Sequence, residues 1–221
     1  MSKSHIAEIT CPKCHCKGEF EVWDSINADL HPDLRDRLFR NDLFLYTCPI
    51  CGAHIEICYG TLYHDMTHKF MLFFDYEKSE DFDYSPLQMP EGLGMEGYTF
   101  RVVFGLSHLK EKIVILEQGL DDLVIEHMKY MTSHVIMPEI AEKGYHLLFN
   151  RTEEATKEFP FGTIYFSYVD PEQEKIFTIR FAMDNYHEHR LACEIDPRMH
   201  IENGMCIDEA WMSIQLKKEE Q

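Results

Sequence analysis

Two short cysteine motifs carry the clearest chemistry in this sequence. The segments C-P-K-C at 11–14 and C-P-I-C at 48–51 are two copies of the pattern C-P-x-C. Two thiolates spaced in this way can face one metal ion, and the proline presets a dihedral angle of the tight turn between them. Four thiolates about 2.3 Å from one ion complete a tetrahedral shell. We therefore predict one structural zinc ion held by Cys11, Cys14, Cys48 and Cys51, with no coordination position left open for catalysis.

The chain between the two motifs, residues 15–47, is longer than the loop of a short zinc ribbon. We expect a strand, a small helix and a second strand to occupy it, so that each motif closes a hairpin-like arm and the metal ties the arms together. Gly52 follows the second motif and tolerates the positive φ that such a turn often needs. A small unit of this kind gains folding stability from its metal.

Two other interpretations of the four cysteines stay open. They could be reduced thiols without a metal, or they could hold iron in a rubredoxin-type centre, because ligand softness and geometry alone do not separate zinc from iron. Cys16 could replace Cys14 as a ligand, whereas Cys58 lies outside the pattern. His15 and His54 flank the motifs, and we interpret them as neighbours of the site and not as ligands.

A histidine pair offers an alternative site near the C-terminus. If residues 185–191 form a strand, His187 and His189 share a face and could bind a second metal ion. The protein would then be a metal-dependent enzyme with a site in the C-terminal region. The sequence contains no G-x-S-x-G, phosphate-binding glycine loop or H-E-x-x-H motif, so no catalytic residue is predicted.

The charge balance restricts the class of partner. The chain has 39 acidic and 21 basic residues and a net charge of −18, which disfavours nucleic acid and anionic membranes. Nucleic-acid binding would need a local basic patch, for which the candidates are Lys13, Lys17, Arg35, Arg37 and Arg40. No apolar run is long enough to span a bilayer, and the N-terminus lacks an apolar signal core. We expect a cytoplasmic protein with reduced cysteines and a protein partner.

The pattern of apolar residues predicts an α+β fold in four segments. Residues 1–75 form the zinc-ribbon-like β unit, in which His31-Pro32 begins a small inserted helix with Leu34 and Leu38 on one face. Residues 76–97 are rich in acidic residues, proline and glycine and indicate a linker or loop.

The second half of the chain is expected to change from helices to strands. Residues 98–140 are predicted to form a strand followed by a helical hairpin. Residues 141–221 are predicted to be an antiparallel β-rich region, with strands over 145–149, 162–169 and 175–183 and a hairpin turn at 170–174.

Several stretches of the chain together resemble the CpXC family of bacterial proteins, over residues 9–130. The paired C-P-x-C motifs and the G-L-D-D turn between two helices are the most specific parts of this resemblance. It implies that the four cysteines bind a metal, and it names no reaction. The stretches are ITCPKC (9–14), FEVWDSINADLHPDLRDRLF (20–39), LFLYTCPICG (43–52), LYHDMTHKFML (62–72) and EKIVILEQGLDDLVIEHMKY (111–130).

Overall fold

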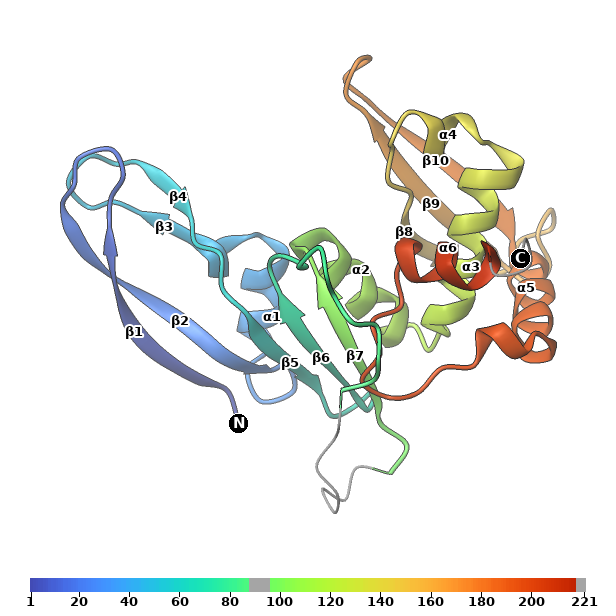
Figure 1. The fold of residues 1–221 in the computed structure, drawn as a ribbon, viewed down its shortest axis with the longest axis horizontal. Helices are drawn as coiled ribbons and strands as arrows, with labels where there is room; N and C mark the ends of the chain where they lie inside the picture. Colours follow the sequence, from blue (N-terminus) through green and yellow to red (C-terminus); the bar gives the residue numbers. More distant parts are fainter. Residues whose placement is uncertain (88–95, 218–221) are drawn as a thin grey trace. The chain divides into compact units, whose positions relative to one another are not determined.

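The computed structural model describes residues 1–87 and 96–217, and it has the α+β class expected from the sequence (Figure 1). The chain divides into two compact units. The N-terminal unit comprises Met1–Asp83 and Leu87–Lys110, and the C-terminal unit comprises Tyr84–Pro86 and Glu111–Gln221. The helix α2 (Leu106–Glu117) contains the boundary between them.

The N-terminal unit is built on a five-stranded sheet in the order β1-β2-β5-β6-β7. The pairs β2–β5 and β6–β7 are parallel, and the other two pairs are antiparallel. The strands are β1 (Lys3–Thr10), β2 (Lys17–Asn27), β5 (Thr61–Asp65), β6 (Phe70–Asp75) and β7 (Thr99–Phe104). The strand that follows the acidic segment 76–97 therefore belongs to this sheet; residues 88–95 of that segment lie outside the described residues.

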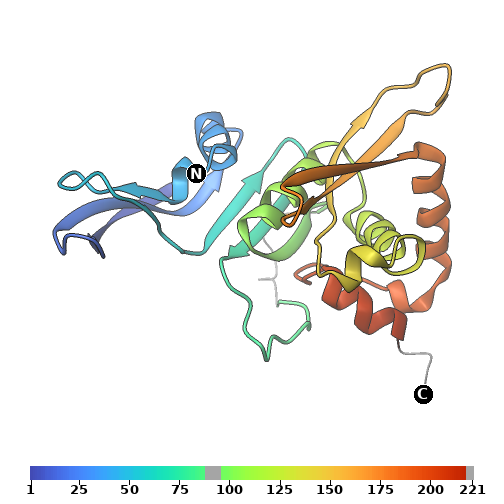
Figure 2. The same ribbon diagram turned by 90° about the horizontal axis from the view of Figure 1, so that it is seen from above.

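A second, smaller hairpin of the same unit carries the second cysteine motif. It consists of β3 (Leu45–Thr47) and β4 (His54–Glu56), and a short helical turn, η1 (Asp42–Phe44), leads into it. In Figure 2 this hairpin runs beside the β1–β2 hairpin to a common end. The predicted small helix is confirmed as α1 (Pro32–Phe39), which buries Leu34 and Leu38.

The C-terminal unit packs helices on a three-stranded antiparallel sheet in the order β10-β9-β8. Its main apolar core joins Ile115, Val124 and Met128 from the helices to Phe149 and Phe166 from the sheet. Every described helix of the chain is too short or too polar to cross a membrane. The elements are α3 (Asp122–Met131), η2 (Thr132–Ile136), α4 (Glu139–Glu142), β8 (Leu148–Glu153), β9 (Thr163–Asp170), β10 (Lys175–Ala182), α5 (Met183–Ile195), η3 (Pro197–Met199) and α6 (Glu209–Leu216).

The structure corrects the prediction of a β-rich region over 141–221. Strands occupy only the part between Leu148 and Ala182, and two helices follow. The alternative metal site at His187 and His189 required a strand over 185–191, and these residues belong instead to α5. His187 and His189 are two positions apart on a helix and so do not share a face, which removes the geometric basis for a second metal between them.

A buried group of charges joins α2 to α3 in the C-terminal unit. The ammonium of Lys129 lies 3.0 Å from a Glu111 carboxylate oxygen and 3.1 Å from one of Glu126. Lys112 lies 3.0 Å from Asp122 and 3.7 Å from Glu126. All five side chains are buried. The carboxylates raise the pKa of both lysines despite the opposing effect of burial, so both ammonium groups stay charged.

His189 instead meets a histidine of another helix. Its Nδ1 lies 2.8 Å from Nδ1 of His127 on α3, so one ring donates a hydrogen bond to the other. Burial, together with the neighbouring His189, lowers the pKa of His127 from 6.5 to about 4, and burial lowers that of His189 as well. The pair therefore packs α3 against α5 in its neutral form.

Replacing Lys129 with methionine should destabilise the protein strongly. The change leaves Glu111 and Glu126 buried without this ammonium, which typically costs about 3–5 kcal/mol. Urea unfolding of the variant measures the loss. The control is Lys175→Met at an exposed end of β10, where we expect a change within about 0.5 kcal/mol. A loss below about 1 kcal/mol for Lys129→Met would contradict the role given to this lysine.

Stability should fall as the pH drops from about 6.5 towards 4, in part because of His127. Above pH 6.5 the ring is neutral in both states; below it, the unfolded chain takes up a proton that the folded chain resists. After allowance for the ring's partial exposure, we expect a loss of about 1 kcal/mol at pH 5. Urea unfolding at several pH values measures it. His127→Gln should flatten this dependence, whereas His187→Gln, at an exposed position, should leave it unchanged; equal profiles would contradict the assignment.

Candidate metal centre

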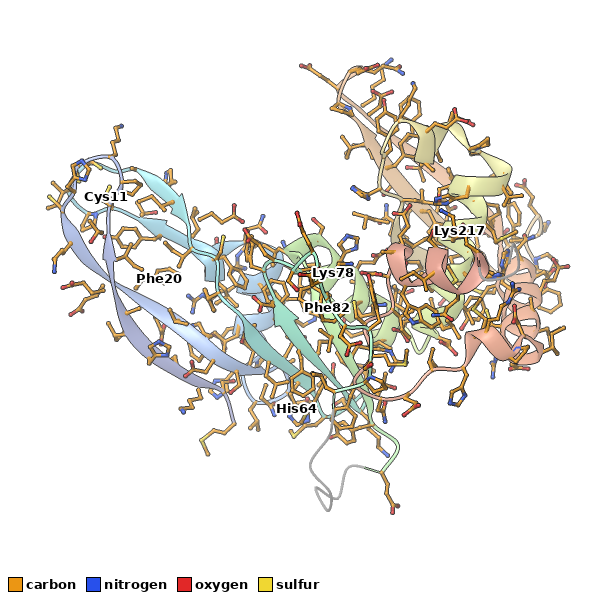
Figure 3. All side chains as sticks on the ribbon, in the orientation of Figure 1. Cys11, Phe20, His64, Lys78, Phe82 and Lys217 are labelled. Carbon is orange, nitrogen blue, oxygen red and sulfur yellow. The ribbon has the colours of Figure 1, made fainter. Side chains whose placement is uncertain are left out.

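The two C-P-x-C motifs form the turns of two hairpins. The first lies between β1 and β2, and the second lies between β3 and β4. Figure 3 labels Cys11 at this end of the N-terminal unit. The sulfur atoms of Cys11, Cys14, Cys48 and Cys51 all lie within 4.8 Å of one another. The structure thus brings together all four cysteines that the sequence singled out, from segments that are far apart in the chain.

The distances between sulfurs match the size of a tetrathiolate metal shell. The Sγ atoms of Cys11 and Cys51 are 3.7 Å apart, and those of Cys14 and Cys48 are 3.6 Å apart. A regular tetrahedron with metal–sulfur bonds of about 2.3 Å has edges of about 3.8 Å. A disulfide would require about 2.05 Å, and all eight cysteines of the chain are free thiols. These four residues could therefore hold one metal ion.

The two turns have matching backbone hydrogen bonds. The N–H of His15 donates to Cys11 O, and the N–H of Gly52 donates to Cys48 O, each at 2.9 Å. His15 and Gly52 also share a left-handed conformation, with φ of 59° and 68°. Gly52 adopts this conformation without strain, as the sequence predicted. His15 adopts it at an energetic cost, because its Cβ atom crowds the backbone in this conformation. The two turns therefore present their cysteines in the same way, from different sequences.

Backbone N–H groups in these turns favour the thiolate form of two cysteines. Those of Cys51 and Ile50 lower the pKa of Cys48 to about 6. The backbone N–H of Cys14 lowers the pKa of Cys11. The backbone N–H of Cys16 also acts to lower the pKa of Cys14. Burial and the three neighbouring sulfurs outweigh this effect, so the pKa of Cys14 is raised. Four thiolates could share so small a volume only around a cation, and a divalent metal ion would supply one.

Tyr46 and Gly18 support the site from the side of the protein core. Tyr46 is buried together with Cys11 and Cys48. A Cβ atom at Gly18 would come within 1.9 Å of the Tyr46 hydroxyl, so only glycine lets this ring pack here. Burial raises the pKa of Tyr46, and the neighbouring cysteine thiolates raise it further. Neither residue was predicted from the sequence, although the glycine two positions after Cys16 was a usable signal.

The remaining candidate residues lie outside the group of four sulfurs. Cys16 is half-buried and Cys58 is exposed, and neither joins it among the described residues. His15 and His54 are exposed, as expected of neighbours of the site. The Nδ1 of His54 is 3.0 Å from the Thr47 hydroxyl across the β3–β4 pair. His54 therefore contributes to the hairpin and not to the sulfur cluster.

Comparison with known proteins gives one result. No curated protein and no solved structure matches the chain. The model of a protein family described as "CpXC protein" matches residues 9–129. The match contains both cysteine motifs, α2 and nearly all of α3, and it agrees with the extent of the resemblance found in the sequence. Because the family model covers more than half of the chain, this protein belongs to the CpXC family.

Proposed function

We propose that this protein holds one structural zinc ion through Cys11, Cys14, Cys48 and Cys51 and acts as a non-catalytic module that binds another protein. The observation that supports it most is the convergence of four sulfur atoms within 4.8 Å at the joined ends of two hairpins. Four thiolates fill the tetrahedral shell of zinc and leave no position for a substrate or for water. A metal so enclosed shapes the protein and does not react.

The metal has a mechanical role in this proposal. It links turns that are separated by residues 15–47, and no disulfide or ion pair between described residues joins the tips of the two hairpins. Because the sulfurs meet only in the folded protein, the free energy of metal binding adds to the free energy of folding. Zinc therefore fixes the surface that the two turns present.

The tips of the two turns are a suitable surface for a protein partner. Pro12, Lys13 and Pro49 are exposed, and Ile50 exposes 68% of its surface beside the sulfur cluster. An apolar side chain held at a rigid, metal-bound turn can enter a pocket of a partner at little cost in conformational entropy. The net charge of −18 favours a protein over nucleic acid or an anionic membrane as the partner.

Elemental analysis of the purified full-length protein tests the metal assignment. We expect one equivalent of zinc and no visible colour. Cys14→Ser should lose most of this zinc, because a serine hydroxyl is not ionised near neutral pH. Cys16→Ser, two positions away, is the matched control and should keep one equivalent.

A different metal content would point to a different function. Bound iron with visible absorption would favour a rubredoxin-like electron carrier, and two metal equivalents would favour a metal-dependent enzyme. Loss of zinc from Cys16→Ser and not from Cys14→Ser would reassign the first turn. Any of these results would contradict the proposal.

A second experiment tests the protein-binding role. The zinc-loaded protein is used as bait in a lysate, and the captured protein is compared with that captured by Ile50→Asp. We expect about tenfold less partner on the variant, which is the effect of losing a central apolar contact. Ile176→Asp, whose side chain is 72% exposed on the β9–β10 hairpin, is the control and should capture as much as the original. Equal capture by Ile50→Asp, or capture lost on nuclease treatment, would contradict the proposal.

A further inference from the structure

A cavity of about 700 Å³ lies in the N-terminal unit at the base of the β3–β4 hairpin. Its walls come from the two residues after α1, from η1, β3 and β4, from the residue that follows β6, and from the first two turns of α2. The volume is in the range of about 300–1,000 Å³ that holds small organic ligands. All of its lining residues belong to the described part of this unit.

Lys110 places a cation in this cavity without a carboxylate partner. Its Nζ donates a hydrogen bond to the carbonyl oxygen of Phe39 at 3.2 Å and another to Oδ1 of Asn41, and both acceptors are neutral. Among the described residues, no acidic side chain comes within ion-pair distance of it. The side chain is half-buried, and this burial lowers the pKa of Lys110. In a chain of 39 acidic residues, a partly desolvated ammonium with only neutral partners indicates room for an external anion.

Arg40 adds a second cation at the same cavity. Its Nε donates to the Asp42 carboxylate at 2.9 Å in an exposed ion pair. Among the described residues its terminal nitrogens have no partner, so they remain available to a ligand. A guanidinium presents paired donors that match the oxygens of a carboxylate or a phosphate. Lys110 and Arg40 therefore give the cavity one side suited to an anionic group.

Aromatic side chains give the cavity an apolar part. Phe44 is fully buried and forms part of the wall, and its ring centroid lies 6.1 Å from that of Tyr76, with an interplanar angle of 62°. The Tyr76 hydroxyl donates to the Glu56 carboxylate, which also lines the cavity. The half-buried Tyr76 ring, supported by the buried Phe44, lies in the same cavity as the two cations. This arrangement fits a ligand with a flat apolar body and a charged end, and Glu56 disfavours a second negative group on that ligand.

We propose that this cavity binds a small organic anion, a carboxylate or phosphate ester with an aromatic body, through Lys110 and Arg40 at its charged end and along its ring through Tyr76, which packs on the buried Phe44. The hairpin of the cysteine motif positions part of the wall. Leu45 and Glu56, which both line the cavity, are direct partners across β3 and β4. The binding site is separate from the sulfur cluster, and the proposal goes beyond the protein-binding role.

Isothermal titration of the metal-loaded, full-length protein tests the proposal with phenyl phosphate and benzoate as probes. We expect saturable one-site binding of at least one of them below about 10 mM, and the tighter probe identifies the anionic group. Inorganic phosphate and phenol are run in parallel, and each should bind at least tenfold more weakly. Inorganic phosphate lacks the aromatic body, and phenol lacks the anionic group. Either of them binding as tightly as the probes would overturn the proposal, as would no saturable binding of either probe.

Two variants assign the binding to this cavity. Lys110→Gln should weaken the better probe about tenfold or more, because it replaces a charge-assisted hydrogen bond with a neutral one. Ser107→Trp, at an exposed position on the rim, should block binding by filling the cavity while leaving every charge in place. Lys17→Gln removes an exposed cation of the same unit, which is paired with Glu8, and should bind as the original does. Unchanged affinity in both Lys110→Gln and Ser107→Trp would overturn the proposal.

Discussion

The convergence of four sulfur atoms from two hairpins is the constraint on which the architecture of the N-terminal unit depends. The β1–β2 and β3–β4 hairpins belong to different sheets, and their turns meet at the cysteines. Around this point the other features are arranged in support: backbone N–H groups face the sulfurs, Tyr46 lies beneath them, and Gly18 makes space for its ring. Without a cation, four thiolates this close together would repel one another. The four sulfurs are arranged so that one cation could neutralise the repulsion between them.

The cavity beneath the small hairpin shows how this constraint extends into the unit. In the β3–β4 hairpin, Thr47 pairs with His54 next to the cysteine turn, and Leu45 pairs with Glu56 at the cavity wall. A hairpin of three residues in each strand is marginal by itself. Its position depends on what holds its two ends, the sulfur cluster at one and the aromatic packing of Phe44 at the other. A metal site and a ligand site can therefore share one short element without sharing a residue.

The sequence predicted the site better than the fold around it. Spacing alone was sufficient for the four cysteines, and Pro32 with Leu34 and Leu38 was sufficient for α1, because these signals are local. The parallel pairing of β6 with β7 was not predictable, since a long acidic segment separates the two strands and the pairing depends on contacts across it. The strand β1 was missed because the stretch before Cys11 is mostly polar and reads as a terminal segment.

In the C-terminal unit the errors have a different cause. Residues 185–191 contain alternating histidines that suggest a strand, but the period of the buried residues Tyr186 and Cys193 is that of a helix. The partner of His189 is His127, 62 positions earlier, and nothing in either local sequence predicts that they meet. The buried lysines and carboxylates of α2 and α3 were likewise invisible, because a charged residue in a sequence is normally assigned to the surface.

The left-handed conformation of His15 has a consequence for how an ion would leave the protein. A non-glycine residue in this conformation stores about 1 kcal/mol, and Gly52 at the equivalent place in the other turn stores almost none. Opening the first turn releases that energy, whereas opening the second does not. For a bound ion, opening the first turn is therefore the less costly way out, by about 1 kcal/mol. Each turn supplies two sulfurs, but the two turns differ in the energy that opening them releases.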